Sequence, residues 1–352
     1  MSLDATADFV VDFPTLGYLW ADWIAWHCPI PDGFHRGEPY VMSDWQLWNT
    51  LNHGRVKPTV QFVPQNPIKG QAFVYRRTQV IAPQKTGKGP WSASMACNSA
   101  LGPELFAGWA VGGEVYDCRD YGCGCGFVYE YEPGEPMGMP WPTPLIQMLA
   151  TSEDQVDNMW RPLVSMVKNG PLSERMRAGE EFIRIGDDGR IDKVTSNAQS
   201  RLGNPTTAAY QDETGIYTIP NGMWKVARTM RRGVAGMGGR VIETTNSYDP
   251  AEKSIAQATF ESTSTDIFRF YREPPAKLSF KNKRERRKIL EFVYEGSWWV
   301  DLDAIEAEAV ELMETDPAEA ERFFGNRRVR GLGTWLPDGA WEKAYGAPTL
   351  AA

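Results

Sequence analysis

Histidine is scarce in this chain of 352 residues and is confined to its amino-terminal part, at His27, His35 and His53. Two large groups of hydrolases depend on imidazole, namely zinc enzymes with an HExxH helix and enzymes with a Ser-His-Asp triad. The first group is excluded, because no HExxH segment occurs. A triad would have to take its base from the amino-terminal segment.

Cysteine is also sparse, and its five residues form an odd, unevenly spread set. Such a set indicates reduced thiols of a cytosolic protein rather than a disulfide framework. Cys118, Cys123 and Cys125 stand close together, but their C-x4-C-x-C spacing is unusual for zinc and no histidine is near them in the chain. We therefore expect free thiols in this segment, with a zinc site as the less favoured alternative.

Long apolar runs and an excess of basic residues are both missing. No stretch approaches the roughly 18 consecutive apolar residues of a membrane span, and the first residues are acidic where a secretory signal would be basic. Lys and Arg total 37 against 45 Asp and Glu, so the net charge of −8 excludes a uniformly basic coat for nucleic acid. We expect a soluble, unexported protein with no membrane partner, located in the cytoplasm of its host cell.

The alternation of strand-forming and helix-forming segments predicts an α/β fold with a mostly parallel sheet. Residues 1–55 are rich in tryptophan and predict an amino-terminal helical arm, and residues 56–268 predict the core. Residues 269–352 change character, since a basic run at 277–288 precedes an acidic run at 301–321. We expect a small carboxyl-terminal subdomain there, followed by the start of a linker.

Strand and helix signals within the core follow a regular order. We expect strands at 72–82, 143–149, 206–210 and 240–242, helices from Pro90, from Ser152 and through Met223 to Met230, and an irregular ribbon at 111–143. Strands followed by helices in this order are typical of open sheets that bind ligands at the carboxyl ends of their strands.

A glycine-rich loop with a lysine follows the first predicted strand. The segment Ala82-Pro-Gln-Lys-Thr-Gly-Lys-Gly89 departs from the phosphate-binding motif, because Ala82 replaces the first glycine and Gly89 replaces the final Ser or Thr. Phosphate binding still needs only a tight turn, a lysine and a helix amino terminus, which Gly87, Lys88 and the helix from Pro90 supply. The alternative is a solvated turn.

Polar residues follow two later strands of the predicted sheet. Asp212 and Glu213 stand where a Walker B pair would, with one carboxylate to hold Mg²⁺ and the other to orient water, although a surface turn is the alternative. The segment Glu243-Thr-Thr-Asn246 follows the next strand. In a doubly wound sheet, all of these groups would converge with the loop on one crevice.

Four segments together resemble the large terminase subunit, the ATP-driven DNA-packaging motor of tailed bacteriophages. They are Gln84-Lys-Thr-Gly-Lys88, Ala150-Thr-Ser-Glu-Asp-Gln155, Asp212-Glu213 and the stretch from Ala235 to Pro250. The resemblance implies a RecA-like (ASCE) P-loop NTPase fold with a carboxyl-terminal lid subdomain. It also implies binding of ATP and Mg²⁺, ATP hydrolysis, and translocation of double-stranded viral DNA into a procapsid.

The resemblance assigns roles to individual residues. Lys88 is the phosphate lysine within the nucleotide-binding loop, Asp212 the magnesium carboxylate, Glu213 the catalytic carboxylate, and Thr244 to Asn246 the coupling motif. Two matches are looser: Arg201 as the arginine finger and Gln46 as the reader of adenine, with a solvent-facing Arg and a structural Gln as the alternatives. The expected contacts with nucleotide and catalytic groups are Gln46, Gln84, Lys85, Thr86, Gly87, Lys88, Gly89, Glu213, Thr245 and Asn246.

The sequence departs from the family at two points. Gly89 has no hydroxyl for Mg²⁺, so Thr86, Ser92 or a water molecule must take its place, or turnover is weak. The chain also ends near the expected start of the family's nuclease domain, which predicts a motor without that domain.

The family implies double-stranded DNA, a portal protein, a small terminase subunit and a ring of about five copies as partners. The basic run at 277–288 is a DNA contact or a solvated helix face, and Lys225, Arg228, Arg231 and Arg232 are expected to face DNA or a neighbouring subunit. The rival hypotheses are a non-hydrolysing DNA-binding adaptor with a degenerate phosphate loop and a RecA-like helicase fragment.

Overall fold

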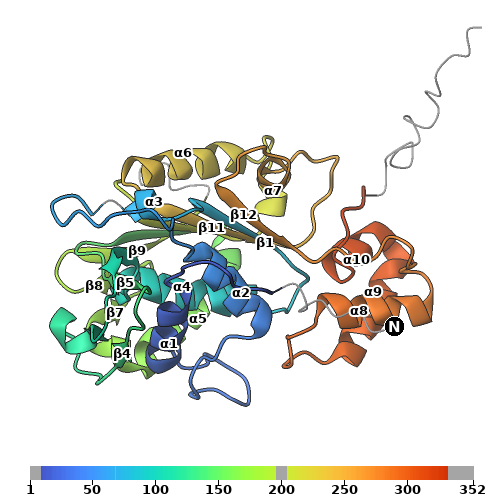
Figure 1. Ribbon diagram of the computed structural model, residues 1–352. Helices are drawn as coiled ribbons and strands as arrows, with labels where there is room; N and C mark the ends of the chain where they lie inside the picture. The colour runs from blue at the N-terminus through green and yellow to red at the C-terminus, as the bar shows by residue number, and fades with distance from the viewer. Residues whose placement is uncertain (1–8, 68, 196–203, 332–352) are drawn as a thin grey trace, which may run out of the picture.

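The computed structural model describes residues 9–67, 69–195 and 204–331. Within these ranges the chain forms an eight-stranded sheet in the order β12-β1-β11-β10-β6-β9-β8-β7 (Figure 1). Neighbouring strands from β12 to β9 run parallel, and β8 and β7 continue the sheet as an antiparallel edge. In sheet order the strands are Ile267–Tyr271, Arg77–Ile81, Arg240–Thr245, Ala208–Gln211, Leu145–Leu149, Gly189–Val194, Phe182–Ile185 and Met176–Ala178.

Both faces of the parallel part of the sheet are covered by helices. On one face lie α1 (Gly17–His27), α2 (Asp44–His53), α4 (Lys88–Leu101) and α5 (Glu153–Asn169), and on the other α6 (Met223–Gly236) and α7 (Ile255–Phe260) (Figure 1). Successive residues of β10 show the two environments, since Ala208 and Tyr210 pack in one apolar cluster and Ala209 in the other. With helices on both faces, every residue of β1, β10 and β11 is buried.

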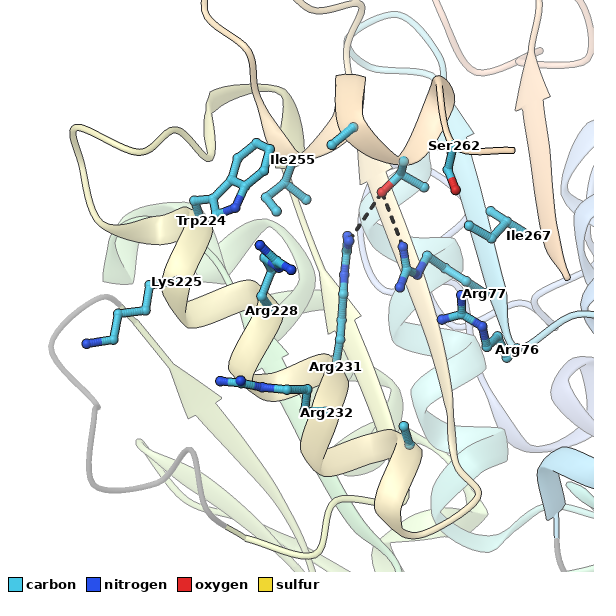
Figure 2. Close-up of a pocket in the computed structure, with 13 residues that line it drawn as sticks. Arg76, Arg77, Trp224, Lys225, Arg228, Arg231, Arg232, Ile255, Ser262 and Ile267 are labelled. Atoms are coloured by element: carbon cyan, nitrogen blue, oxygen red, sulfur yellow. Dashed lines mark hydrogen bonds between the residues drawn. The ribbon is translucent and has the colours of Figure 1, made fainter. Parts of the chain in front are cut away.

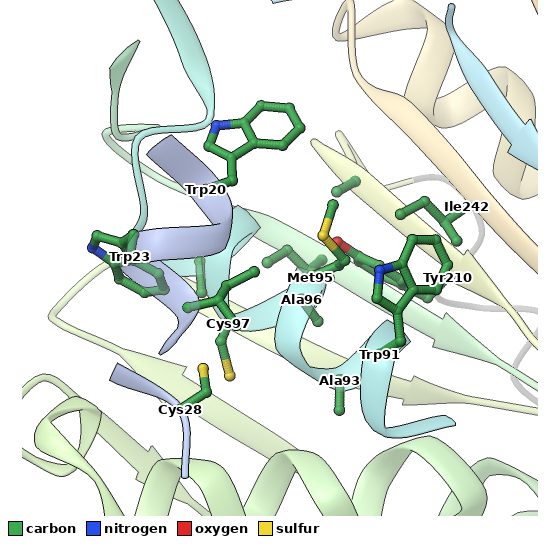
Figure 3. Close-up of a cluster of buried hydrophobic side chains, with 14 of the residues drawn as sticks. Trp20, Trp23, Cys28, Trp91, Ala93, Met95, Ala96, Cys97, Tyr210 and Ile242 are labelled. Atoms are coloured by element: carbon green, nitrogen blue, oxygen red, sulfur yellow. The ribbon is translucent and has the colours of Figure 1, made fainter. Parts of the chain in front are cut away.

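The tryptophan-rich amino-terminal segment belongs to the main hydrophobic core. Trp20 and Trp23 of α1 and Trp91 of α4 are almost completely buried and lie in one cluster (Figure 3). Their indole groups need partners when buried, and Trp20 Nε1 donates to Pro103 O at 2.8 Å while Trp91 Nε1 donates to Thr50 Oγ1 at 3.0 Å. These contacts fix α1 and α2 against α4, the helix that follows β1.

The ribbon expected at 111–143 is present as two antiparallel pairs. β2 (Leu105–Trp109) pairs with β5 (Pro136–Met139), and between them β3 (Val115–Asp117) pairs with β4 (Val128–Glu130). The three clustered cysteines lie at the tip between β3 and β4, where η1 spans Cys118–Tyr121. Shorter elements complete the core: α3 (Lys69–Ala72), η2 (Pro171–Glu174) and η4 (Thr214–Ile216).

The carboxyl-terminal helices form a small subdomain with its own core. α8 (Lys283–Val293), α9 (Leu302–Thr315) and α10 (Pro317–Phe323) pack around Ile289, Leu290, Ala309 and Phe324, and lie beside the β1 end of the sheet (Figure 1). Residue 268, where the sequence places the end of the core, lies within β12, so the sheet continues to Tyr271. Among the described helices, none combines the length and the apolar character needed to cross a membrane.

Candidate nucleotide-binding site

The loop between β1 and α4 has the geometry of a phosphate-binding turn. Lys85 and Gly87 have φ values of +65° and +92°, and α4 begins at Lys88, earlier than the expected start at Pro90. A left-handed residue directly before a helix turns the first backbone N–H groups of that helix toward the loop, where they and the helix dipole favour an anion. The loop therefore presents the backbone amide groups that phosphate binding requires.

Lys88 is buried at the centre of this loop. Its ammonium group donates to Ala82 O at 2.8 Å, to Pro83 O at 2.7 Å and to Asn246 Oδ1 at 2.9 Å. Burial lowers the pKa of Lys88, and the carboxylates of Glu213 and Asp212 act against that shift. The lysine and the two acids thus share one site, as the resemblance implies.

Asp212 follows β10 directly and is 3% exposed. Thr244 Oγ1, from the neighbouring strand β11, donates to Asp212 Oδ1 at 2.6 Å. Burial raises the pKa of Asp212, whereas the bond from Thr244 and the charge of Lys88 lower it. An oxygen donor oriented by a hydroxyl group and close to a phosphate loop is the ligand type that Mg²⁺ prefers.

Glu213 is held in an uncommon backbone conformation, with φ of +53°. Left-handed geometry at a residue other than glycine costs on the order of 1 kcal/mol and persists where surrounding contacts enforce it, often at functional sites. Burial and the neighbouring charge of Asp212 raise the pKa of Glu213 to about 7, and Lys88 acts in the opposite sense. A carboxylate with a pKa near neutrality suits a group that orients or deprotonates water.

Asn246 joins Lys88 to the carboxylate of Glu213. Its Oδ1 accepts from Lys88, and its Nδ2 donates to Glu213 Oε2 at 3.2 Å, while its backbone N–H donates to the same oxygen at 3.4 Å. Its neighbour Thr245 accepts from Gly215 N at 2.9 Å and so fixes the turn after Glu213. One amide side chain therefore contacts both halves of the site.

Glu243 does not join the other polar residues of this segment, contrary to the expectation from sequence. The strand expected to end at 242 runs to Thr245, so Glu243 lies inside β11. It pairs with Arg231 of α6 and accepts from Thr259 Oγ1 at 3.3 Å. Strand alternation explains the difference, because adjacent residues of β11 point to opposite faces of the sheet.

The missing hydroxyl at position 89 has a steric explanation. A Cβ on Gly89 would lie 2.3 Å from the backbone oxygen of Asn158 in α5. Of the expected substitutes, Thr86 donates to Pro83 O at 2.9 Å within its own loop. The buried hydroxyl of Ser92, in contrast, has no hydrogen-bond partner among the described residues.

A cavity of about 580 Å³ opens beside the phosphate loop, between the amino-terminal segment and the carboxyl-terminal subdomain. Gln46 lines it, but both ends of its side chain are engaged: Oε1 accepts from Ser43 N at 3.1 Å, and Nε2 donates to Tyr40 at 3.1 Å and to Gly87 O at 3.4 Å. Gln46 thus has the structural role that was its alternative and also faces the cavity.

Trp299, which the sequence analysis does not identify, closes the loop from the subdomain side. Its Nε1 donates to Lys85 O at 3.1 Å, and its ring would lie 2.6 Å from a Cβ at Gly87. Ser297 donates to Thr86 O at 3.4 Å, and Gln84 N donates to Phe323 O at 3.0 Å. The subdomain thus contacts the phosphate loop directly, as a lid would.

A second cavity, of about 760 Å³, lies between α6, α7 and the first residues of β1 (Figure 2). Five arginines line it, namely Arg76, Arg77, Arg228, Arg231 and Arg232. Arg231 pairs with Glu243, and burial lowers the pKa of Arg77 to about 9. The expected polar face of α6 is present, since Lys225, Arg228 and Arg232 are exposed.

The basic run at 277–288 divides into two groups. Arg286 is buried and pairs with Glu306 at 3.2 Å, and Arg287 pairs with Asp303, so these two arginines hold α8 to the acidic helix α9. The others in the run are exposed: Lys277, Lys281, Lys283, Arg284 and Lys288. Arg201, the expected arginine finger, lies outside the described residues.

Comparisons with known proteins bear on the fold. No family model matches the chain. The Gene 13 protein of Mycobacterium phage D29 is 23% identical over 310 residues, which are 80% of this chain and 48% of that protein. The Gene 13 protein of Mycobacterium phage L5 is 21% identical over 301 residues, 77% of this chain and 47% of the relative.

Among solved structures, the HK97 bacteriophage large terminase is similar with a TM-score of 0.59 and 15% identity, covering 89% of this chain and 55% of that one. This chain therefore spans about half the length of the relatives it matches. The expected resemblance to large terminases is confirmed in the fold, a mostly parallel α/β sheet flanked by helices.

Proposed function

We propose that this chain is the ATP-hydrolysing motor part of a large terminase, which moves double-stranded viral DNA into a procapsid in the cytoplasm of the host cell. The observation that carries the proposal is the hydrogen-bonded connection from Lys88 through Asn246 to Glu213, beside Asp212, at the carboxyl edge of a parallel sheet. The fold shared with the HK97 large terminase supports it.

The residues around the loop fit a magnesium nucleotide. Asp212 is the residue that would hold Mg²⁺, with the unpartnered hydroxyl of Ser92 as the candidate to assist in place of a side chain at Gly89. When bound, Mg²⁺ neutralises charge on the phosphates. Gln84 to Gly89 would surround the phosphates, and the cavity beside Gln46 would receive the base.

Hydrolysis requires changes in the contacts of Lys88. Its ammonium is bound by two loop carbonyls and by Asn246, so it must leave some of these partners to reach phosphate oxygens. Once Lys88 leaves, the side chain of Asn246 keeps its hydrogen bonds to Glu213. Glu213 can then orient the attacking water, and Asn246, with Thr245 behind it, reports the state of the phosphate site to the sheet.

Changes at the phosphates reach the carboxyl-terminal subdomain through its contacts with the loop. Trp299 and Ser297 touch the loop at Lys85 and Thr86, so a change at the phosphates shifts the subdomain that carries the exposed cations of α8. We propose that these cations and those of α6 meet DNA or a neighbouring subunit. The proposal also includes a ring of about five copies on a portal and a small terminase subunit that selects the genome. Arg201 would be the arginine finger that each subunit gives to its neighbour.

An ATPase assay with and without duplex DNA tests the proposal on wild type, Lys88→Ala and Glu213→Gln. The matched control is Glu252→Gln, at an exposed position outside the site. We expect both site variants to lose at least about 100-fold in turnover, because each removes a charge that acts on the transferring phosphoryl or its nucleophile. Because a monomer lacks the finger of a neighbour, the assay includes high protein concentration and added portal.

The non-hydrolysing adaptor is a second candidate, and the Gly89 position favours it. The close approach of α5 leaves no room there for the hydroxyl group that usually assists Mg²⁺. The adaptor predicts binding of a fluorescent ATP analogue without hydrolysis, even with portal and DNA present. Turnover that depends on Glu213 would reject it.

A further inference from the structure

The tip of the ribbon brings three cysteines against a histidine at the end of α1. Cys118 Sγ, Cys123 Sγ and Cys125 Sγ lie 3.6, 3.7 and 3.0 Å from His27 Nε2, and all four ligand atoms lie within 4.8 Å of one another. Tetrahedral zinc with Zn–S of about 2.3 Å and Zn–N of about 2.0 Å places sulfur and nitrogen about 3.5 Å apart. The observed distances bracket that value.

The expectation of free thiols rested on the lack of a histidine near the cysteines in the chain. His27 precedes Cys118 by 91 residues, yet α1 packs against the ribbon tip and places the imidazole among the thiols. The fourth ligand is therefore tertiary, which local spacing does not show. The set of one histidine and three cysteines is one that structural zinc sites use.

The histidine is oriented for metal binding by its other nitrogen. His27 Nδ1 lies 2.7 Å from the backbone oxygen of Trp23, one helical turn earlier. Because a carbonyl only accepts, Nδ1 carries the proton and Nε2 presents its lone pair to the thiols. A backbone carbonyl behind a ligand histidine is the usual outer contact of a metal site. The Trp23 ring stacks on the imidazole at 4.0 Å and holds its plane.

The cysteine loop has the features of a metal-binding turn. Gly122 and Gly126 have φ values of +77° and +81°, and Phe127 N–H donates to Cys125 Sγ at 3.4 Å. Backbone N–H groups that point at sulfur stabilise a thiolate. The β3–β4 pair that carries the loop has three residue pairs in register, which is too short to be stable alone.

We propose that His27, Cys118, Cys123 and Cys125 bind one structural Zn²⁺ ion. Binding releases three thiol protons and forms three Zn–S bonds and one Zn–N bond, with no change of oxidation state. Four protein ligands leave no open position, so the ion has a structural role and not a catalytic one. The N/S donor set selects zinc over the hard ions Mg²⁺ and Ca²⁺.

The ion would tie the ribbon to the helix that supports the core. Trp20 and Trp23 of α1 lie in the main hydrophobic cluster, and the ribbon begins with the β2–β5 pair, after the carboxyl end of α4. Without the metal, the loop would retain two kinds of hydrogen bond from outside: the Arg175 guanidinium donates to Tyr121 O and Gly122 O at 2.8 Å, and Trp26 Nε1 of α1 donates to Cys125 O at 3.2 Å. Zinc therefore stabilises the amino-terminal half of the fold.

Metal analysis of the purified full chain tests this. We expect one equivalent of zinc per chain by plasma mass spectrometry after expression with zinc and extensive dialysis. Cobalt substitution should give the absorption of a tetrahedral site with thiolate charge transfer. Removal of zinc with a strong chelator should lower the unfolding midpoint by at least about 5 °C. Wild-type protein without stoichiometric zinc, with iron in its place, or with a disulfide in this loop, would overturn the assignment.

Variants separate these ligands from the other two thiols. Cys28 and Cys97 lie close to one another in the hydrophobic core (Figure 3). Neither belongs to the group of four candidate zinc ligands. Cys97→Ala, the matched control, should keep one zinc, whereas Cys125→Ser should lose at least about 10-fold in zinc affinity. Equal zinc affinity in Cys125→Ser and wild type, measured by competition with a chelator, would refute the proposal. If Cys125→Ser does not fold, the cobalt spectrum of the wild-type protein decides.

Discussion

The backbone oxygen of Asn158 lies where a side chain on Gly89 would begin, at 2.3 Å from the position of a Cβ. Helices α4 and α5 approach so closely at this point that glycine is required there, and the phosphate loop lacks its usual hydroxyl for a packing reason. The contact is between a helix that starts the nucleotide site and a helix that follows β6, so the two elements are fixed together at the site.

Restoring the family residue at this position should therefore destabilise the protein. In an open helix, Gly→Ala stabilises by about 0.5–1 kcal/mol, but here the added atom meets backbone that cannot rotate away. We expect Gly89→Ala and Gly89→Ser to lower the free energy of unfolding by about 1–3 kcal/mol, measured by denaturant titration. Gly236→Ala in α6, where nothing lies within 4 Å of the added carbon, should be neutral or stabilising. The same loss in both would contradict this account.

Apolar strands and the Gly-Lys loop were predictable because their signals are local. β1, β6, β10 and β11 are buried on both faces, and their sequences are rich in apolar and β-branched residues. β7, β8 and β9 were missed, since they form the edge of the sheet and carry charged residues such as Arg184 and Asp192. β12 was missed because the change in charge just beyond it suggested a boundary.

The residues of the candidate site that follow strands were predictable from sequence, whereas those that reach it by tertiary packing were not. Lys88, Asp212 and Asn246 follow strands, so topology alone brings them to one edge of the sheet. Trp299 reaches the loop from another subdomain, and His27 reaches the cysteines through packing of α1, and neither contact leaves a pattern in the chain. Contacts of this kind depend on tertiary packing over a long sequence separation.

Replacement of Asn246 should separate nucleotide binding from hydrolysis. The amide accepts from Lys88 and donates to Glu213, so Asn246→Ala frees the lysine for phosphate but leaves the carboxylate unoriented. We expect the Kd of a fluorescent ATP analogue to stay within about threefold while kcat falls at least about tenfold, a loss of at least about 1.4 kcal/mol in the transition state. Asn66→Ala, at an exposed position, is the control. A parallel loss of binding and turnover would show that Asn246 only supports the loop.

The pKa of Glu213 predicts that kcat for ATP hydrolysis changes with pH near neutrality. Since the carboxylate must be ionised to accept a proton, kcat should rise with pH and level off above about 7. Asn246→Asp, which puts a negative charge beside Glu213, should move this limb to higher pH. An unchanged limb in Asn246→Asp would assign it to another group.

The titration of Glu213 should also make stability depend on pH, and the free energy of unfolding should fall over the pH range in which kcat rises. Its pKa is raised from 4.5 in the unfolded chain to about 7 in the folded one, so the folded state binds more protons between these values. Stability must then fall as pH rises through this window. Glu213→Gln cannot titrate, and we expect its free energy of unfolding relative to wild type to increase by about 1–3 kcal/mol from pH 5 to pH 8. A pH-independent difference between the two proteins would contradict the raised pKa.

The cations of α6 should reveal whether the arginine-lined cavity faces DNA or a neighbouring subunit. Lys225, Arg228 and Arg232 are exposed around it (Figure 2). Arg231, in contrast, forms an ion pair with Glu243 of β11. Each phosphate contact adds about 0.9 to the slope of log binding constant against log salt concentration. If α6 meets DNA, the triple alanine variant at the exposed positions should lose affinity and up to about 3 in that slope. Lys168→Ala, at an exposed position of α5, should change neither. If α6 instead meets a neighbouring subunit, the triple variant should keep the salt dependence of DNA binding. It should lose the rise in ATPase rate with protein concentration, because only assembly would then depend on these charges.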